Sequence, residues 1–174
     1  MIRRWIGPLI AGAVLGVMAW QGTLTMAPDA LMHLALKRVS AVGGPNHFSH
    51  APLATAASRA IVRPSPDLAY SSCPFDLGKG PLLIDAVPVL APYWSLSIFD
   101  KHTNVVLVRN GMKAAYKPFR IAVLAAGQVA PAGYEAVPID GRSGIALVRI
   151  LIDDRARFPV IDRERRATTC RVAG

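Results

Sequence analysis

The chain has 174 residues, of which 52% are hydrophobic and 18% are charged. Once an apolar N-terminal segment is set apart, roughly 120 to 140 residues remain, enough for one domain with one hydrophobic core. Lys and Arg outnumber Asp and Glu by 20 to 11, but they form no long basic block, and aromatic residues do not interleave with the C-terminal arginines. We therefore expect no nucleic-acid partner.

Residues 1–27 are predicted to be a membrane anchor in contact with the lipid bilayer. After Arg3 and Arg4, the run from Trp5 to Met26 carries no charge and is long enough to cross a bilayer as one helix. A cleaved signal peptide is the alternative, but no small-x-small cleavage pattern precedes Pro28. We expect an uncleaved signal anchor with a cytoplasmic N-terminus, because Arg3 and Arg4 are the basic residues closest to the membrane edge.

Residues 28–45 are predicted to be a helical connector. Pro28 and Asp29 are typical of a helix start, and the helix would run from Ala30 to Val42 before Gly43, Gly44 and Pro45 end it. Its apolar stripe is expected to contain Leu31, Leu34 and Ala35.

Residues 46–174 are predicted to form a mainly β domain. Between Tyr93 and Asp100, Trp94, Leu96 and Ile98 alternate with Ser95 and Ser97, the period of a half-buried strand. Further short strands are expected over Leu82–Leu90, Asn104–Arg109, Arg120–Ala125, Tyr134–Ile139 and Ile145–Asp153. Because no long helix separates them, they predict an antiparallel sandwich or an open barrel, with short flanking helices that include one over Pro159–Thr169.

The residues in and between the expected strands indicate how those strands are connected. Pro88 lacks an amide donor, so the Leu82–Leu90 strand is expected at a sheet edge or at a bulge. Asp100 to Thr103 has hairpin length, and Asn110-Gly111 indicates a second hairpin. Asp140 to Gly144 is expected to be a turn that joins the last two strands.

Cys73 and Cys170 are the only cysteines, and they are too few and too distant for a C-x-x-C zinc motif. Two interpretations remain open from the residues alone: a disulfide that closes a loop of nearly a hundred residues, or two buried free thiols.

Several motifs resemble the bacterial domain-of-unknown-function family 1254. They are Asn46-His47-Phe48-Ser49-His50, then Val62 to Ser71 (VRPSPDLAYS), Phe75-Asp76-Leu77 with Gly80-Pro81, and Tyr93-Trp94-Ser95-Leu96 leading to Asp100 and Thr103-Asn104. Longer relatives typically have Asn at the position of Ser65. The resemblance implies a β-sandwich domain in the bacterial envelope and no agreed activity.

The short, membrane-anchored branch of this family lacks the family 1214 domain that follows in longer relatives. Its members resemble this chain in having one cysteine before the Phe-Asp-Leu motif and another near the C-terminus. The resemblance therefore implies a Cys73–Cys170 disulfide, an anchor in the inner (cytoplasmic) membrane with a periplasmic domain, and a separate partner chain that carries a family 1214 domain.

Candidate chemistry is sparse. His47, His50, His102 and Asp67 form a weak metal-like set, which we interpret as ordinary loop and surface residues, so no metal and no cofactor are expected. As nucleophiles, Ser71, Ser72 and Ser143 would each need a positioned base and an oxyanion hole, and the sequence indicates neither.

Asp67, Tyr70 and Asp76 form a denser acidic and aromatic group before the first expected strand. They could line a small pocket, although turn capping and packing explain them more simply. We therefore predict a non-enzymatic envelope protein that acts in binding or assembly with a partner chain. The alternative is a small-molecule-binding or hydrolytic domain with a pocket near Asp67, Tyr70 and Asp76.

Overall fold

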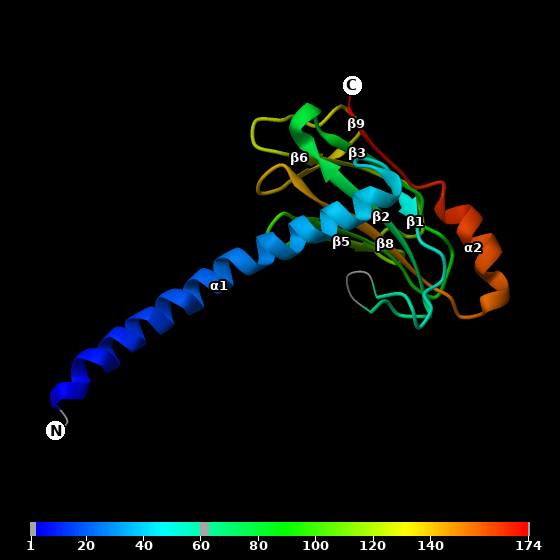
Figure 1. Cartoon of the computed structure of the whole chain (residues 1–174). Helices are drawn as coiled ribbons and strands as arrows, with labels where there is room; N and C mark the ends of the chain where they lie inside the picture. Colours follow the sequence, from blue (N-terminus) through cyan, green and yellow to red (C-terminus); the bar gives the residue numbers. More distant parts are fainter. Residues whose placement is uncertain (1–2, 60–62, 174) are drawn as a thin grey trace.

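Two β-sheets packed face to face and one long N-terminal helix make up the computed structural model, which describes residues 3–59 and 63–173 (Figure 1). Residues 1 and 2 of the predicted anchor and Val62 of the family motif lie outside the described residues. The predicted mainly β fold is confirmed as a sandwich of two open sheets, and the sheets do not close into a barrel.

The larger sheet, sheet A, is antiparallel throughout. Its strands, in spatial order, are β1 (Ser49–His50), β2 (Leu68–Asp76), β8 (Ser143–Leu151), β4 (Trp94–Asp100) and β5 (Val105–Asn110). The hairpin predicted at Asp100 to Thr103 connects β4 to β5. β2 lies before the first strand expected from the sequence, so this strand was not predicted.

The smaller sheet, sheet B, is mixed. Its strands, in spatial order, are β7 (Glu135–Pro138), β6 (Phe119–Leu124), β3 (Leu82–Ala86) and β9 (Thr169–Val172). β6 and β7 run parallel, so the prediction of antiparallel pairing is wrong for this pair. β3 ends before Pro88 and lies between β6 and β9, so it is neither an edge strand nor bulged at the proline.

Two predicted turns join different sheets instead of neighbouring strands. Asn110-Gly111 leads from β5 in sheet A towards β6 in sheet B, and Asp140 to Gly144 leads from β7 in sheet B to β8 in sheet A. The hairpin predicted at Asn110-Gly111 is therefore wrong. Asp140 to Gly144 does connect the last two predicted strands, but these strands belong to different sheets.

The hydrophobic core lies between the sheets. Trp94, Leu96 and Ile98 of β4 are at most 1% exposed, as predicted. The Trp94 and Phe119 rings meet edge to face with centroids 6.1 Å apart, which links the two sheets. Ser95 and Ser97 on the other face of β4 are also fully buried. The half-buried interpretation is therefore wrong, and Arg149 of β8 donates a hydrogen bond of 3.1 Å to Ser97 Oγ there.

A disulfide between Cys73 and Cys170 crosses the sandwich, from β2 in sheet A to β9 in sheet B, with Cα atoms 6.8 Å apart. Three short helices complete the domain: η1 (Leu77–Lys79), η2 (Arg155–Arg157) and α2 (Phe158–Arg165). α2 confirms the short helix predicted near the C-terminus, and its Ile161 is 1% exposed within the core.

Helix α1 (Arg3–Gly43) continues without a break through Pro28, so the expected anchor and connector form one element. At about 1.5 Å per residue it is about 60 Å long. Its C-terminal half contacts β1, β2 and β8 and buries Met32, whereas Leu31 and Leu34 are exposed. The predicted apolar stripe is therefore wrong, because the domain packs against a neighbouring face of the helix.

The N-terminal half of α1 projects away from the domain (Figure 1). Within the described part of the chain, α1 is the one helix long and apolar enough to span a membrane. Trp5, Leu9, Leu15 and Trp20 are each more than 60% exposed, so no part of the domain covers this apolar surface.

Candidate functional site

The three residues predicted to line a pocket lie along β2 and just before it. Tyr70 and Asp76 lie on β2 with six residues of strand rise between them, about 20 Å. The Tyr70 hydroxyl accepts a hydrogen bond of 3.0 Å from the Ser65 amide, and Asp76 Oδ1 accepts one of 2.8 Å from Gly78 N. Asp67 is exposed just before β2, and its carbonyl accepts from Ile152 N at 2.8 Å. Each of these contacts stabilises local backbone.

The histidines of the weak metal-like set are also separated. His47 Nδ1 lies 3.0 Å from the Pro45 carbonyl, and His50 Nδ1 lies 2.8 Å from Ser71 Oγ. His102 contacts Asp29 through Nδ1, and its Nε2 lies 3.3 Å from Asp140 Oδ2. No group of three His, Cys, Asp or Glu residues within 3–59 and 63–173 has the arrangement of a metal site. The His102 contacts instead connect α1 to the β domain.

Ser71 and His50 form a serine–histidine pair that the sequence did not reveal, because they are 21 residues apart and meet only through β1–β2 pairing. Ser71 is 2% exposed, and the cavity described below is lined by other residues. A nucleophilic serine needs access to its substrate as well as a base. We therefore assign this pair a structural role.

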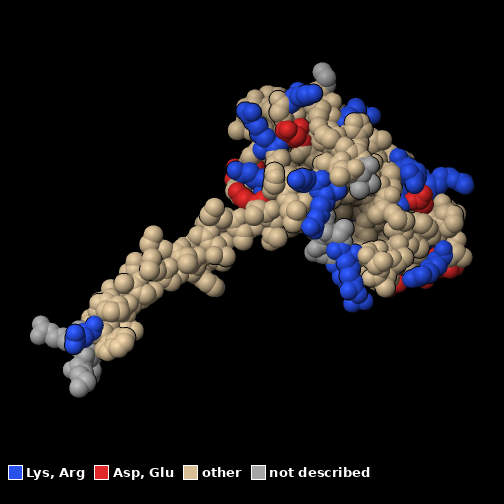
Figure 2. All heavy atoms as spheres, in the orientation of Figure 1, with Lys and Arg blue, Asp and Glu red and all other residues tan. Residues whose placement is uncertain are grey.

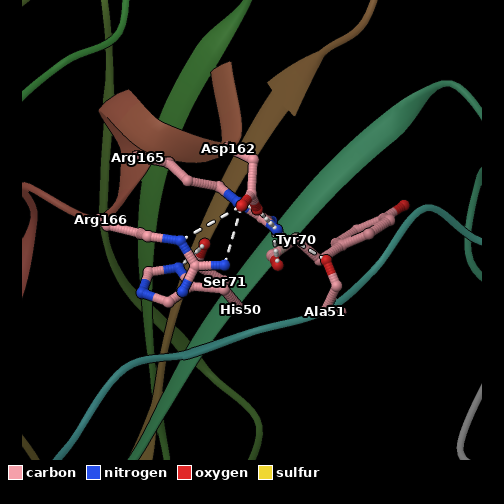
Figure 3. Close-up of polar contacts among 7 residues, drawn as sticks. All are labelled: His50, Ala51, Tyr70, Ser71, Asp162, Arg165 and Arg166. Carbon is pink, nitrogen blue, oxygen red and sulfur yellow. Dashed lines mark hydrogen bonds and ion pairs between the residues drawn. The ribbon is translucent and has the colours of Figure 1, made fainter. Parts of the chain in front are cut away.

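Arg165 of α2 forms hydrogen bonds with the backbone on either side of the Ser71–His50 pair. Its guanidinium is 1% exposed and donates to the carbonyls of Tyr70 (2.8 Å) and Ala51 (2.7 Å) and to the Asp162 carboxylate (Figure 3). Asp162 also accepts two hydrogen bonds from Arg166, at 2.8 and 3.2 Å. Burial raises the pKa of the Asp162 carboxyl, but the bonds and charges of Arg166 and Arg165 outweigh burial and hold it below its usual value. These contacts fasten α2 to the edge of sheet A.

The same surroundings lower the pKa of His50 below 6.5, first through burial and then through the positive charges of Arg165 and Arg166. Because the unfolded chain then binds a proton more readily than the native protein, the free energy of unfolding is fully retained above pH 6.5. It falls as the pH drops from 6.5 towards the native pKa.

We expect a His50→Asn variant, which can keep a hydrogen bond to Ser71, to lose this part of the pH dependence. Urea unfolding at about pH 5 and about pH 8 measures the effect as the difference between wild type and variant. Parallel stability curves for the two proteins would contradict the lowered pKa.

A cavity of about 780 Å³ opens at one end of sheet B and is the best candidate for a functional site. It is lined by Asp85, Ala86 and Val87 from β3 and the residues after it, by Pro118, Phe119 and Arg120 at the start of β6, and by Gly133, Tyr134 and Arg171. Arg171 belongs to β9, so three adjacent strands contribute side chains to it.

Asp85 is the centre of the polar group in this cavity. Its Oδ1 accepts a hydrogen bond of 3.0 Å from the Tyr134 hydroxyl, and its Oδ2 accepts one of 2.6 Å from Arg171. Arg120 Nε lies 3.3 Å from Oδ1, and the Arg120 guanidinium stacks 5.7 Å from the Tyr134 ring centroid. Burial raises the Asp85 pKa, but hydrogen bonds from Arg171 and Tyr134 and the charges of both arginines outweigh it, so the pKa is below its usual value.

Sequence analysis missed this site. The available signal was Asp85 itself, which interrupts the apolar run Leu82–Leu90, because a carboxylate in a buried strand requires charged or hydrogen-bonding partners. Arg120, Tyr134 and Arg171 are 35 to 86 residues away along the chain from Asp85, and strand pairing alone brings them together.

Comparison with known proteins supports the fold. The VPA0106 protein from Vibrio parahaemolyticus has a solved structure similar to this one, with a TM-score of 0.64 and 15% identity, over 86% of this chain and 35% of that chain. An uncharacterized protein from Burkholderia cenocepacia gives a TM-score of 0.47 and 14% identity, over 88% of this chain and 41% of that chain. The chain thus spans about a third of the length of the Vibrio protein.

No curated protein matches the chain. The model of one family, described as protein of unknown function (DUF1254), matches residues 45–171. The match covers the β domain from just before β1 into β9 and includes both disulfide cysteines. The chain therefore belongs to the DUF1254 family.

Proposed function

We propose that the chain is a single-pass, membrane-anchored envelope protein whose β domain lies outside the cytoplasm, where it acts in binding or assembly with a partner chain. The observation that carries this proposal is the exposed apolar half of α1. No basic or acidic residue occurs from Trp5 to Pro28, and the projecting helix in Figure 2 shows no charged side chain between its tip and the β domain. From Trp5 to Met26 this surface is about 33 Å long, close to the thickness of a hydrocarbon core of about 30 Å.

The disulfide supports the proposed location of the β domain outside the cytoplasm. Such bonds persist in oxidising compartments and are rare in the cytosol. Arg3 and Arg4 precede the apolar segment, an arrangement that favours a cytoplasmic N-terminus and, in a bacterial envelope, a domain in the periplasm.

The anchor is tested by washing isolated membranes with alkaline carbonate, which releases peripheral proteins. We expect wild type to stay in the pellet and a Val14→Lys/Leu15→Lys variant to shift to the soluble fraction, because each Lys at a helix centre opposes insertion by about 3 kcal/mol. A Val14→Ile/Leu15→Ile variant is the matched control and should behave as wild type. Release of the wild-type protein by carbonate would contradict the anchor.

The domain's location needs a separate test. Protease added to intact spheroplasts should digest the β domain from outside, after reduction if the disulfide protects it. A domain digested only after the spheroplasts are lysed would contradict a periplasmic location.

The partner we propose is a separate chain carrying a family 1214 domain, because longer relatives combine that domain with a family 1254 domain. Extraction in a mild detergent followed by affinity purification should recover both chains together. Recovery of this chain alone as a monomer would count against assembly and would leave the anchor proposal intact.

A further inference from the structure

The cavity beside Asp85 has the charge and volume of a ligand site, and the anchor and partner proposals do not explain it. Its volume of about 780 Å³ is within the usual range for small-molecule pockets. It is open to solvent at the end of sheet B, since the side chains of Arg120 and Arg171 are 63% and 53% exposed.

The polar groups of the cavity carry a net positive charge. Arg120 and Arg171 contribute two guanidiniums, and Asp85 contributes the one carboxylate among the described lining residues. A guanidinium has five N–H donors. Arg171 uses Nη1 for Asp85 and Nη2 for Tyr134, and Arg120 turns Nε to Asp85, which leaves further N–H groups of both arginines for a ligand.

The arginines are held in place before any ligand arrives. Asp85 and Tyr134 fix Arg171 with hydrogen bonds of 2.6 and 3.2 Å, and the Tyr134 ring stacks against Arg120. Preorganised guanidiniums suit the planar geometry of a carboxylate or the oxygens of a phosphate. The other lining residues include the apolar residues Ala86, Val87, Pro118 and Phe119.

We propose that this cavity binds a small organic anion, with Arg120 and Arg171 holding its carboxylate or phosphate group and the apolar lining residues contacting its hydrocarbon part. Asp85 is a positioning residue: it holds the two arginines and competes with the ligand for their N–H groups. Asp85→Asn removes the negative charge that competes with the ligand, so it should strengthen anion binding. Loss of either arginine should weaken anion binding.

The test uses the full-length protein in a neutral detergent and isothermal titration calorimetry with benzoate, phenyl phosphate and the neutral analogue benzamide. Wild type should bind at least one of the two anions more tightly than benzamide. Arg120→Gln and Arg171→Gln should each weaken anion binding by about tenfold or more, since each removes charge-assisted hydrogen bonds. Asp85→Asn should bind the anion more tightly than wild type.

Arg157→Gln is the matched control. It removes the same charge from an arginine of similar exposure, 47%, which lies on η2 and pairs with Asp153. It should bind as wild type does, and thermal unfolding checks that every variant is folded. Three results would overturn the proposal: benzamide binding as tightly as both anions, Arg157→Gln losing as much affinity as Arg171→Gln, or Asp85→Asn in its folded state losing affinity.

Discussion

Replacing both cysteines, as Cys73→Ala with Cys170→Ala, is expected to lower the free energy of unfolding by about 4 to 5 kcal/mol. The disulfide closes a loop with a sequence separation of 97 residues. In the chain-entropy model, a cross-link over such a loop lowers the conformational entropy of the unfolded chain, which corresponds to about 4 to 5 kcal/mol of stability. Because whole domains are commonly stable by only about 5 to 15 kcal/mol, the variant would be near the limit of folding. Urea unfolding of the full chain in detergent measures the change.

The control for this prediction is the reductant. Wild type treated with dithiothreitol should approach the stability of the double variant, while the double variant itself should not respond. A wild-type protein equally stable with and without reductant would show that the bond between β2 and β9 contributes little.

Replacing Arg165 by Met is expected to cost about 3 kcal/mol of stability, at the lower end for a broken buried ion pair because Asp162 keeps Arg166 as a partner. The change leaves the Ala51 carbonyl without its 2.7 Å donor and removes one of the bonds to the Tyr70 carbonyl. It also loses the contact of the guanidinium with the Phe158 ring, 5.6 Å from its centroid.

Arg163→Met is the matched control, because Arg163 lies on the same helix and is exposed. It should change the free energy of unfolding by less than about 0.5 kcal/mol, as is usual for surface substitutions. Equal losses for the two variants would mean that helix propensity or net charge, rather than the buried hydrogen bonds, determines the effect.

β2 shows why part of the fold was not predictable from local pattern. Its inward-facing residues are Ala69, Ser71, Cys73 and Phe75, all buried. Small and polar side chains hide the alternation that revealed β4, where Trp94, Leu96 and Ile98 face the core. The segment therefore resembled a turn, although it pairs with β8 along nine residues and lies inside the larger sheet.

The assignment of each strand to one of the two sheets could not be predicted from the sequence, for a different reason. Turn composition at Asn110-Gly111 and Asp140 to Gly144 correctly indicated chain reversals, but composition does not say whether the next strand joins the same sheet. The parallel β6–β7 pair and the placement of β3 between β6 and β9 depend on long-range packing. In contrast, the long apolar N-terminal helix and the Trp94–Ile98 core strand were predictable, because each depends only on its own residues.

The candidate site residues also fall into two groups, those with local contacts and those with partners far away in the sequence. The residues chosen for their local density, Asp67, Tyr70 and Asp76, serve the backbone around them. Asp85 and Arg165 gain their partners from distant strands and helices, so no local motif marks them. Family resemblance, and not spacing, supplied the one long-range pairing that was anticipated, between Cys73 and Cys170.

The most direct test of the account is the intact mass of the protein extracted from membranes of growing cells, with free thiols blocked during lysis and no reductant added. The account predicts the uncleaved N-terminus together with a mass lower by two hydrogens than that of the reduced chain, and no blocked thiol. A mass that begins after the apolar segment would contradict the anchor. Two blocked thiols would contradict an oxidising compartment for the β domain.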